Sequence, residues 1–239
     1  MSDRERAILL EIRKRGLRLP GVGCPALWPA PYDTPGSAVD FVLGELRTWN
    51  EAEQQVQRFP DLEYLRDTGL EWVRCKAEGR ALMIEKCRRM VISWLLRGLE
   101  LHSMGLSRSD QLLSGVDFDS ASKHVWRLSH LYDDLRQRRP EWKLPQAKRI
   151  RDTGERKLVQ FSLPNGSLCE RTNDDPDQVR GEGKSIITFE ELSIFRRPRS
   201  CWAQAMILTQ GAAGQTGGFV VGVCNASANP EWRALKELT

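Results

Sequence analysis

A basic turn between an apolar run and a helical pattern is the first stretch that could do chemistry. Ala81–Glu85 predicts a buried strand, and Trp94–Met104 is expected to be a helix. The turn between them contains, in order, Lys86, Cys87, Arg88, Arg89, Met90, Val91, Ile92 and Ser93. Because a helix N-terminus offers unpaired N–H groups and the positive end of its dipole, this order is typical of phosphate binding. Lysine and arginine add charge, and Ser93 occupies the position of a magnesium-binding hydroxyl.

The turn departs from a regular phosphate-binding loop. No glycine occurs between Gly79 and Gly98, and no lysine directly precedes Ser93. By spacing alone, a basic turn on the protein surface is the better interpretation.

A pair of acids and a polar strand end are two further candidates. Ile186–Phe189 precedes Glu190 and Glu191, as in a buried strand that delivers carboxylates to the ligand-binding edge of an α/β sheet. One carboxylate could hold a hydrated Mg²⁺, and the other could orient a water molecule. In Gly222–Pro230 an apolar strand ends in small polar residues, which could place an amide or hydroxyl near a γ-phosphate. Taken alone, each motif also fits an ordinary surface turn.

The elements that would position these residues alternate between strands and helices. Gln111–Val116 predicts a strand, and Asp119 is expected to cap a helix with one apolar face that extends to Leu135. Two strand-like runs flank Pro164-Asn165-Gly166, which is a strong hairpin signal. The remaining apolar strands are expected at Leu158–Leu163, Leu168–Arg171, Ser185–Phe189 and Phe219–Cys224. This alternation indicates an α/β fold with a largely parallel sheet that is covered on both faces.

The sequence before residue 70 has a different character. Residues 1–36 contain a short charged stretch and then many prolines and glycines, which predicts an irregular arm or linker. Ser37 and Asp40 have capping-box spacing, and the apolar residues from Val39 to Trp49 repeat as in a helix. Leu65–Val73 suggests another short helix. We therefore expect an N-terminal arm and helical segment at 1–70 and the sheet domain at 71–239.

The composition is that of an ordinary globular protein, with 40% hydrophobic and 28% charged residues. The formal charge of +4, from 36 basic and 32 acidic residues, is too small to argue for nucleic acid by itself. The six cysteines lack metal-ligand spacing, so no Cys or His metal site is expected. Solvated faces are the simplest interpretation of the basic clusters Arg136–Arg139, Lys148–Arg151 and Arg196–Arg199.

Taken together and in order, the motifs resemble the large terminases of phages, in the branch that includes Mu-like phages. In that family the nucleotide loop (Walker A) commonly reads Lys-Ser-Arg-Arg-x-Gly-x-Ser, to which Lys86–Ser93 is similar. The other stretches that match in order are Ser114–Ala121, Phe161–Ser167, Asp175–Gly181, Glu190–Glu191 at the Walker B position and Asn225–Asn229 at the coupling motif. The resemblance covers roughly residues 70–239.

The resemblance implies a P-loop NTPase fold of the additional-strand type, with a mostly parallel sheet and a helical N-terminal part. It implies an Mg²⁺-dependent ATPase that moves double-stranded DNA into a procapsid. The implied cofactors are therefore ATP and Mg²⁺. The implied partners are DNA, the portal protein, a small terminase subunit and sister copies in a ring, a pentamer when assembled. The implied location is the procapsid portal in the host cytoplasm.

The resemblance also assigns roles to individual residues. Lys86–Ser93 would bind the nucleotide, and Ser93 and Glu190 would hold Mg²⁺. Glu191 would organise the attacking water, while Arg88 or Arg89 would neutralise developing charge. Arg180 is a weaker candidate for the arginine role. The residues that would couple γ-phosphate loss to movement are Asn225 and Ser227.

Two departures from the family pattern leave an alternative open. Val91 stands where the family usually has glycine, and a Cβ there can block close backbone approach or a positive φ. Glu190 replaces the usual aspartate. A degenerate, non-hydrolysing relative that serves DNA binding or assembly is therefore the alternative. A helicase-like remodeller is a second alternative, but it would need a second RecA-like domain, for which the chain is too short. The family's nuclease domain is expected to be absent, because no room follows Thr239.

Overall fold

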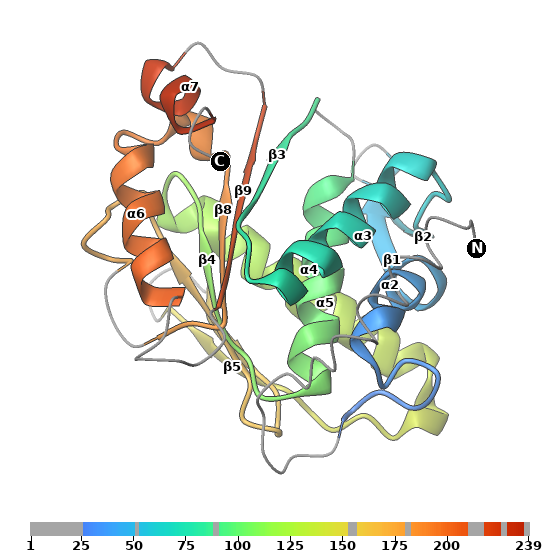
Figure 1. The fold of residues 1–239 in the computed structure, drawn as a ribbon. Coiled ribbons are helices and arrows are strands. Elements are labelled where there is room, and N and C mark those ends of the chain that lie inside the picture. The colour runs from blue at the N-terminus through green and yellow to red at the C-terminus, as the bar shows by residue number, and fades with distance from the viewer. Residues whose placement is uncertain are drawn as a thin grey trace.

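The computed structural model describes residues 26–50, 53–87, 91–152, 157–179, 183–209, 218–225 and 229–236. A central sheet has helices on both faces (Figure 1). The helices are α2 (Ala38–Glu45), α3 (Glu63–Glu78), α4 (Ile92–Leu106), α5 (Phe118–Arg138), α6 (Pro198–Thr209) and α7 (Pro230–Lys236), with short 3-10 turns at Pro35–Ser37, Pro140–Trp142 and Leu192–Ile194. The strands are β1 (Arg47–Asn50), β2 (Gln55–Arg58), β3 (Leu82–Glu85), β4 (Asp110–Ser114), β5 (Lys148–Arg151), β6 (Leu158–Ser162), β7 (Leu168–Thr172), β8 (Ile186–Glu190) and β9 (Phe219–Cys224).

The central sheet has seven strands in the order β3-β9-β8-β4-β7-β6-β5. The first five of these run parallel, with Glu85 paired to Cys224 and Glu190 to Val223 in register. An extra strand, β9, thus lies between β3 and β8, as in the additional-strand class of P-loop NTPases. Every residue of β8 and β9 is buried, which explains why β9 and most of β8 are apolar. The predicted fold class is confirmed.

The other side of the sheet is antiparallel, and the predicted hairpin joins β6 to β7. Gly166 has φ 85°, a conformation that glycine adopts without steric cost. Asn165 closes the turn, since its Oδ1 accepts from the Ser167 N–H at 3.1 Å and its Nδ2 donates to the Met104 carbonyl at 2.6 Å. The basic run Lys148–Arg151 forms β5, the outermost strand on this side.

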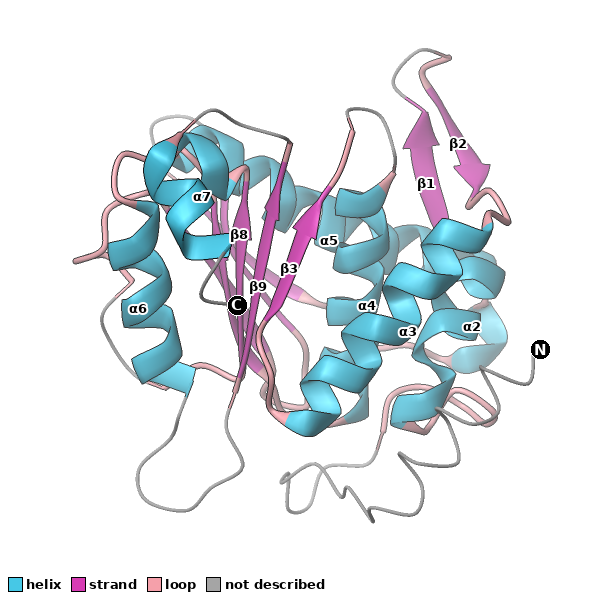
Figure 2. Cartoon of the chain, turned by 45° about the horizontal axis from the view of Figure 1, so that its top comes forward, coloured by secondary structure: helices cyan, strands magenta, loops and turns pink. Residues whose placement is uncertain are grey.

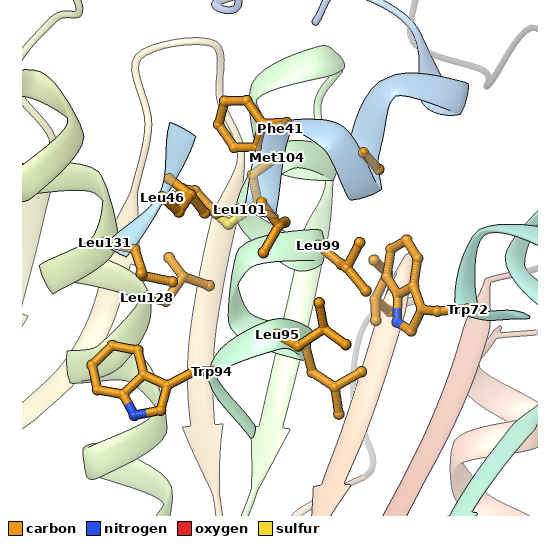
Figure 3. Close-up of a cluster of buried hydrophobic side chains, with 14 of the residues drawn as sticks. Phe41, Leu46, Trp72, Trp94, Leu95, Leu99, Leu101, Met104, Leu128 and Leu131 are labelled. Carbon is orange, nitrogen blue, oxygen red and sulfur yellow. The ribbon is translucent and has the colours of Figure 1, made fainter. Parts of the chain in front are cut away.

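The helices form a layer on each face of the sheet, with α2 to α5 on one and α6 and α7 on the other (Figure 2). The larger core, beneath α2 to α5, mixes side chains from early and late sequence. Figure 3 shows Phe41 and Leu46 close to Leu101 and Met104 of α4. Trp28 also belongs to this core and donates its indole N–H to the His102 carbonyl at 2.8 Å. Side chains that precede residue 70 therefore pack into the same core as the helices of the sheet domain.

Several sequence predictions about local structure were wrong in detail. The helix that was expected to continue to Trp49 ends at Glu45, and Trp49 lies in the β1–β2 hairpin, which was not foreseen. Ser37 makes no capping box, because its hydroxyl donates to the Thr34 carbonyl instead. Asp117, rather than Asp119, caps α5 by accepting from the Ser120 N–H at 2.7 Å.

Other element boundaries moved without changing the fold. The helix around Leu65–Val73 is α3, which has 16 residues. The helix expected at Trp94–Met104 begins two residues earlier, so that Ser93 lies in its first turn. Within the described ranges, no helix has the length and apolar character that a membrane crossing requires.

Candidate functional site

A pocket of about 810 Å³ opens at the C-terminal ends of β3, β8 and β9. Its wall includes a residue after each of these strands, namely Lys86, Glu191 and Asn225. The predicted convergence of the three strand ends is therefore present. The full lining is Thr48, Trp49, Asn50, Gln57, Lys86, Val91, Ile92, Ser93, Trp94, Ser120, Lys123, His124, Arg127, Glu190, Glu191 and Asn225.

The first turn of α4 faces this pocket. Val91 precedes the helix with φ 59° and makes no side-chain cap, while Val91, Ile92, Ser93 and Trp94 all line the pocket. The first N–H groups of a helix have no partner within the helix, so an anion placed here would meet both these groups and the helix dipole. Lys86 lines the same pocket, and its backbone N–H donates to the Cys224 carbonyl at 2.8 Å, which fixes where the turn leaves β3.

Glu190 ends β8 and is almost completely buried, with 2% of its surface exposed. Its Oε2 accepts a hydrogen bond of 3.0 Å from the Ser93 hydroxyl. Its Oε1 is buried without a hydrogen bond to any described residue and faces Arg97 Nη1 at 3.6 Å and His124 Nδ1 at 3.8 Å. Burial, reinforced by Arg97 and Arg127, holds the pKa of His124 well below its usual value, so the imidazole is neutral at pH 7. Of the two groups that face Oε1, Arg97 is therefore the charged one.

A second acid lies behind Arg97. The guanidinium binds Glu100 through two nitrogens, with Nε 2.6 Å from Oε2 and Nη2 2.8 Å from Oε1. Glu100 also accepts from the Thr188 hydroxyl at 2.6 Å. Arg97 and Glu100 are both fully buried. Burial raises the pKa of Glu100, while the adjacent guanidinium opposes that rise.

Glu191 leaves the strand at the point where β8 ends. Its φ of 59° is left-handed, so the side chain no longer follows the alternation of a strand, and it lines the pocket while remaining exposed. This confirms the prediction that the strand ends at Glu190 and that Glu191 turns towards the pocket. Across from it, the Oδ1 atom of Asn225 is buried without a hydrogen-bond partner among the described residues.

Two parts of the pocket wall were not predicted. The β1–β2 hairpin contributes four side chains, of which Asn50 Nδ2 donates to Gln57 Oε1 at 3.1 Å. The helix α5 contributes Ser120, Lys123, His124 and Arg127. The Arg127 guanidinium lies 3.1 Å from His124 Nδ1 and 5.5 Å from the centre of the Trp94 ring. The helix itself was predicted, but the only sequence signal for its place in the pocket wall was that these four polar residues repeat at helical spacing beside the apolar face.

The remaining predicted site residues fall in two groups. Cys87 is exposed and is not part of the pocket wall. The other group lies outside the described residues and comprises Arg88, Arg89, Met90, Arg180 and Ser227. The roles assigned to all of these residues stay predictions.

The residues at the centre of the pocket fit a hard divalent cation. Mg²⁺ prefers oxygen ligands and is held by few protein groups together with water and phosphate oxygens. Ser93 supplies a hydroxyl, and Glu190 Oε1 is a buried carboxylate oxygen that lacks a hydrogen bond. In the described part of the chain, no three His, Cys, Asp or Glu side chains are grouped to hold a metal ion. The other ligands of a bound ion would therefore have to come from elsewhere than His, Cys, Asp or Glu side chains of the described residues.

The strand order and the position of the pocket are those expected of a P-loop NTPase fold. The chain is similar in structure to the HK97 bacteriophage large terminase, with a TM-score of 0.56 at 11% identity over 85% of this chain. It spans 42% of the length of that protein. The ATPase domain of the Thermus phage P74-26 large terminase and a mutant of it are also similar, with TM-scores of 0.44 at 16% and 15% identity over 65% of this chain and 63% of theirs. No protein family model matches the sequence, and no curated protein matches it.

Proposed function

We propose that this chain is the ATPase part of a large-terminase-like DNA-packaging motor. The observation that carries the proposal is the meeting of Ser93 and Glu190 at 3.0 Å, in the same pocket as Lys86 and the N-terminus of α4. A hydroxyl at the start of a helix and an acid at the end of a neighbouring parallel strand are the protein groups that P-loop enzymes use for Mg²⁺–nucleotide. The terminase resemblance of the motifs and the likeness in fold to HK97 large terminase support the choice within that class.

In this proposal the residues of the pocket bind the nucleotide, orient the attacking water and neutralise developing charge. Lys86 and the first N–H groups of α4 bind the phosphates, while Ser93 and Glu190 hold Mg²⁺. The ion, when bound, would neutralise charge that develops on the transferred phosphoryl group. Glu191, exposed at the pocket wall, orients the attacking water and accepts its proton. Arg88, Arg89 and Arg180 remain the candidates for added positive charge.

The hairpin end of the pocket suits the nucleobase. Asn50 and Gln57 carry amides that can both donate and accept, and Trp49 offers a ring beside them. Asn225, whose Oδ1 has no hydrogen-bond partner among the described residues, would respond to loss of the γ-phosphate. Coupling of that response to DNA movement would also involve Ser227. The further partners in this proposal are double-stranded DNA, the portal, a small terminase subunit and sister subunits, and the Mu-like branch is the proposed source.

Nucleotide binding is the first test. ATP affinity is measured by calorimetry with Mg²⁺ for the native chain, for Lys86→Ala and for Lys148→Ala. Lys86→Ala should weaken binding by about 10- to 100-fold, because it removes a charged hydrogen-bond donor to phosphate. Lys148 is an exposed lysine on β5, away from the pocket, so its variant should bind as the native chain does. Equal affinities of native chain and Lys86→Ala would defeat the phosphate assignment.

Measurement of ATP hydrolysis distinguishes the motor from the alternative of a non-hydrolysing module. Val91 at φ 59° favours the alternative of a non-hydrolysing module, because a branched residue is unusual in that conformation. Phosphate release is followed with the native chain alone and then with DNA, portal and small subunit added. Release that depends on DNA supports the motor. ATP binding without turnover under every condition would favour a DNA-binding or assembly module.

A further inference from the structure

Arg97 is a buried charge that the proposed chemistry does not use directly. It lies one helical turn after Ser93 in α4, and none of its surface is exposed. Burying a guanidinium is costly unless acids and hydrogen bonds compensate for the lost water. Two of its nitrogens are taken by Glu100, and the third, Nη1, faces Glu190 Oε1 at 3.6 Å. Arg97 thus lies between two buried carboxylates.

The geometry joins α4 to β8 at three levels. Ser93, Arg97 and Glu100 follow one another at helical spacing and so share one face of α4. On β8, Thr188 and Glu190 are two residues apart and point to the same face of the sheet. Ser93 binds Glu190 at one end of this array, and Glu100 binds Thr188 at the other. Arg97 bridges the two contacts.

Glu190 needs such a support. A glutamate side chain has several rotatable bonds, so its carboxylate can occupy more than one place. The Ser93 hydrogen bond holds only Oε2, and Oε1 accepts no hydrogen bond from the residues that the structure describes. A fixed cation beside Oε1 selects one orientation of the carboxylate. Glu100 in turn holds the cation, through a hydrogen bond from Nη2 to Oε1 at 2.8 Å and an ion-pair contact of Nε with Oε2 at 2.6 Å.

We propose that Arg97, anchored by Glu100, is a positioning residue that sets the Glu190 carboxylate against Ser93 and thereby determines how well the pocket takes up a divalent cation with nucleotide. This inference rests on the proposed nucleotide site. The competing account is that Arg97 and Glu100 form a purely structural pair, whose loss changes stability and nothing else. The two accounts differ in the Mg²⁺ dependence of nucleotide binding by folded protein.

The test measures the affinity for a non-hydrolysable ATP analogue by calorimetry over a range of Mg²⁺ concentrations and in EDTA. The variants are Arg97→Met and the double variant Arg97→Met/Glu100→Met, which removes both charges of the pair. Replacement of a buried ion pair by apolar residues of similar size is often tolerated, so the double variant keeps the test valid if Arg97→Met does not fold. Arg149→Met is the matched control, since Arg149 pairs with Asp133 at 2.5 Å and is not part of the pocket wall. Urea unfolding establishes that each protein is folded.

Mg²⁺ should tighten nucleotide binding in both Arg97 variants, but the Mg²⁺ concentration that gives half of this effect should be about 10- to 100-fold higher than in the native chain. This is the usual effect of removing a residue that orients a metal ligand. Affinity in EDTA should stay at the native level, and Arg149→Met should keep the native Mg²⁺ dependence. A folded double variant with native Mg²⁺ dependence would overturn the positioning role and leave the proposed function standing. A native chain that binds the analogue equally well with Mg²⁺ and EDTA would also overturn it. A native chain without affinity for the analogue would defeat the proposed function itself and this inference with it.

Discussion

The Ser93 hydroxyl donates a hydrogen bond of 3.0 Å to Glu190 although the two residues are 97 positions apart. The contact exists because β3 and β8 run parallel on either side of β9, so the helix that follows β3 begins beside the end of β8. Neither residue identifies a site on its own. Their contact shows that two motifs, each ambiguous in the sequence, bring a hydroxyl and a carboxylate together at one place.

Glu191→Gln should abolish turnover while nucleotide binding persists. Glutamine keeps the size and much of the hydrogen bonding of Glu191 but removes the base, a loss that typically reduces the rate by about a hundredfold or more. Phosphate release and ATP affinity are both measured, under the conditions that give turnover in the native chain. Glu141→Gln is the control, because Glu141 is exposed in the short turn after α5 and is not part of the pocket wall. Native turnover in Glu191→Gln would remove Glu191 from the mechanism.

Val91→Gly should tighten ATP binding. Val91 already holds the positive φ that glycine adopts without cost, and for a branched residue this conformation costs about 1–2 kcal/mol. Glycine also removes a side chain from the pocket wall. Val91→Ala separates the two effects, since alanine shortens the side chain but keeps the Cβ. Calorimetry should find the tightest ATP binding with glycine at position 91, weaker binding with alanine and the weakest with the native valine. An unchanged or weaker affinity for Val91→Gly would contradict this account of the turn.

Gly98→Ala should destabilise the protein by about 1–3 kcal/mol, the usual cost of adding a methyl group to a tight core. A Cβ at Gly98 would lie 2.7 Å from Val42 Cγ1 and 3.0 Å from Leu46 Cδ1, so α2 would have to move away from α4. Gly44→Ala is the comparison, because its nearest neighbour would be the Tyr32 hydroxyl at 3.9 Å. Urea unfolding followed by circular dichroism gives both free energies of unfolding. Equal values for the two variants would show that α2 is not packed tightly on α4.

Stability should fall as the pH drops below 6.5, partly because of His102. Burial, opposed by a hydrogen bond to the Tyr32 carbonyl and aided by the nearby Lys76, lowers the pKa of His102 from 6.5 to about 3. Between these two values the unfolded chain binds a proton that the folded chain does not, so acid favours unfolding by up to about 1.4 kcal/mol per pH unit. His102→Gln removes this titration. The free energy of unfolding, measured from pH 4 to 7, should therefore depend less steeply on pH in His102→Gln than in the native chain, and parallel curves would be the contrary result.

The sheet was the most predictable part of the molecule. β8 and β9 are buried on both faces, so β9 and most of β8 are apolar and stand out in the sequence. The β1–β2 hairpin was missed for the opposite reason. Gln55–Arg58 has no buried residue, and the apolar spacing of α2 continues past its real end into Trp49. Local pattern did not reveal that the chain becomes extended at Leu46.

The site was predictable where it depends on strand ends and unpredictable where it depends on helix faces. The collinear motifs located Lys86, Ser93, Glu190, Glu191 and Asn225, which all line one pocket. The wall from α5 was missed, because polar residues beside an apolar helical face usually meet water. Arg97 and Glu100 were missed for a related reason, since a basic and an acidic residue three apart are typical of a solvated helix surface. The pair is buried because α4 is packed between the sheet and the neighbouring helices α2, α3 and α5.

The outermost position of β5 has a consequence for how the protein behaves at high concentration. An outer strand presents unpaired backbone groups to solvent and can add a strand from another molecule, which is a common start of aggregation. Of the residues of β5, Lys148, Ile150 and Arg151 are exposed, so two positive charges flank the one exposed apolar side chain. Two molecules that approached along this edge would bring those charges together. The basic run is therefore expected to oppose extension of the sheet into a neighbouring copy along β5, an effect that requires no ligand.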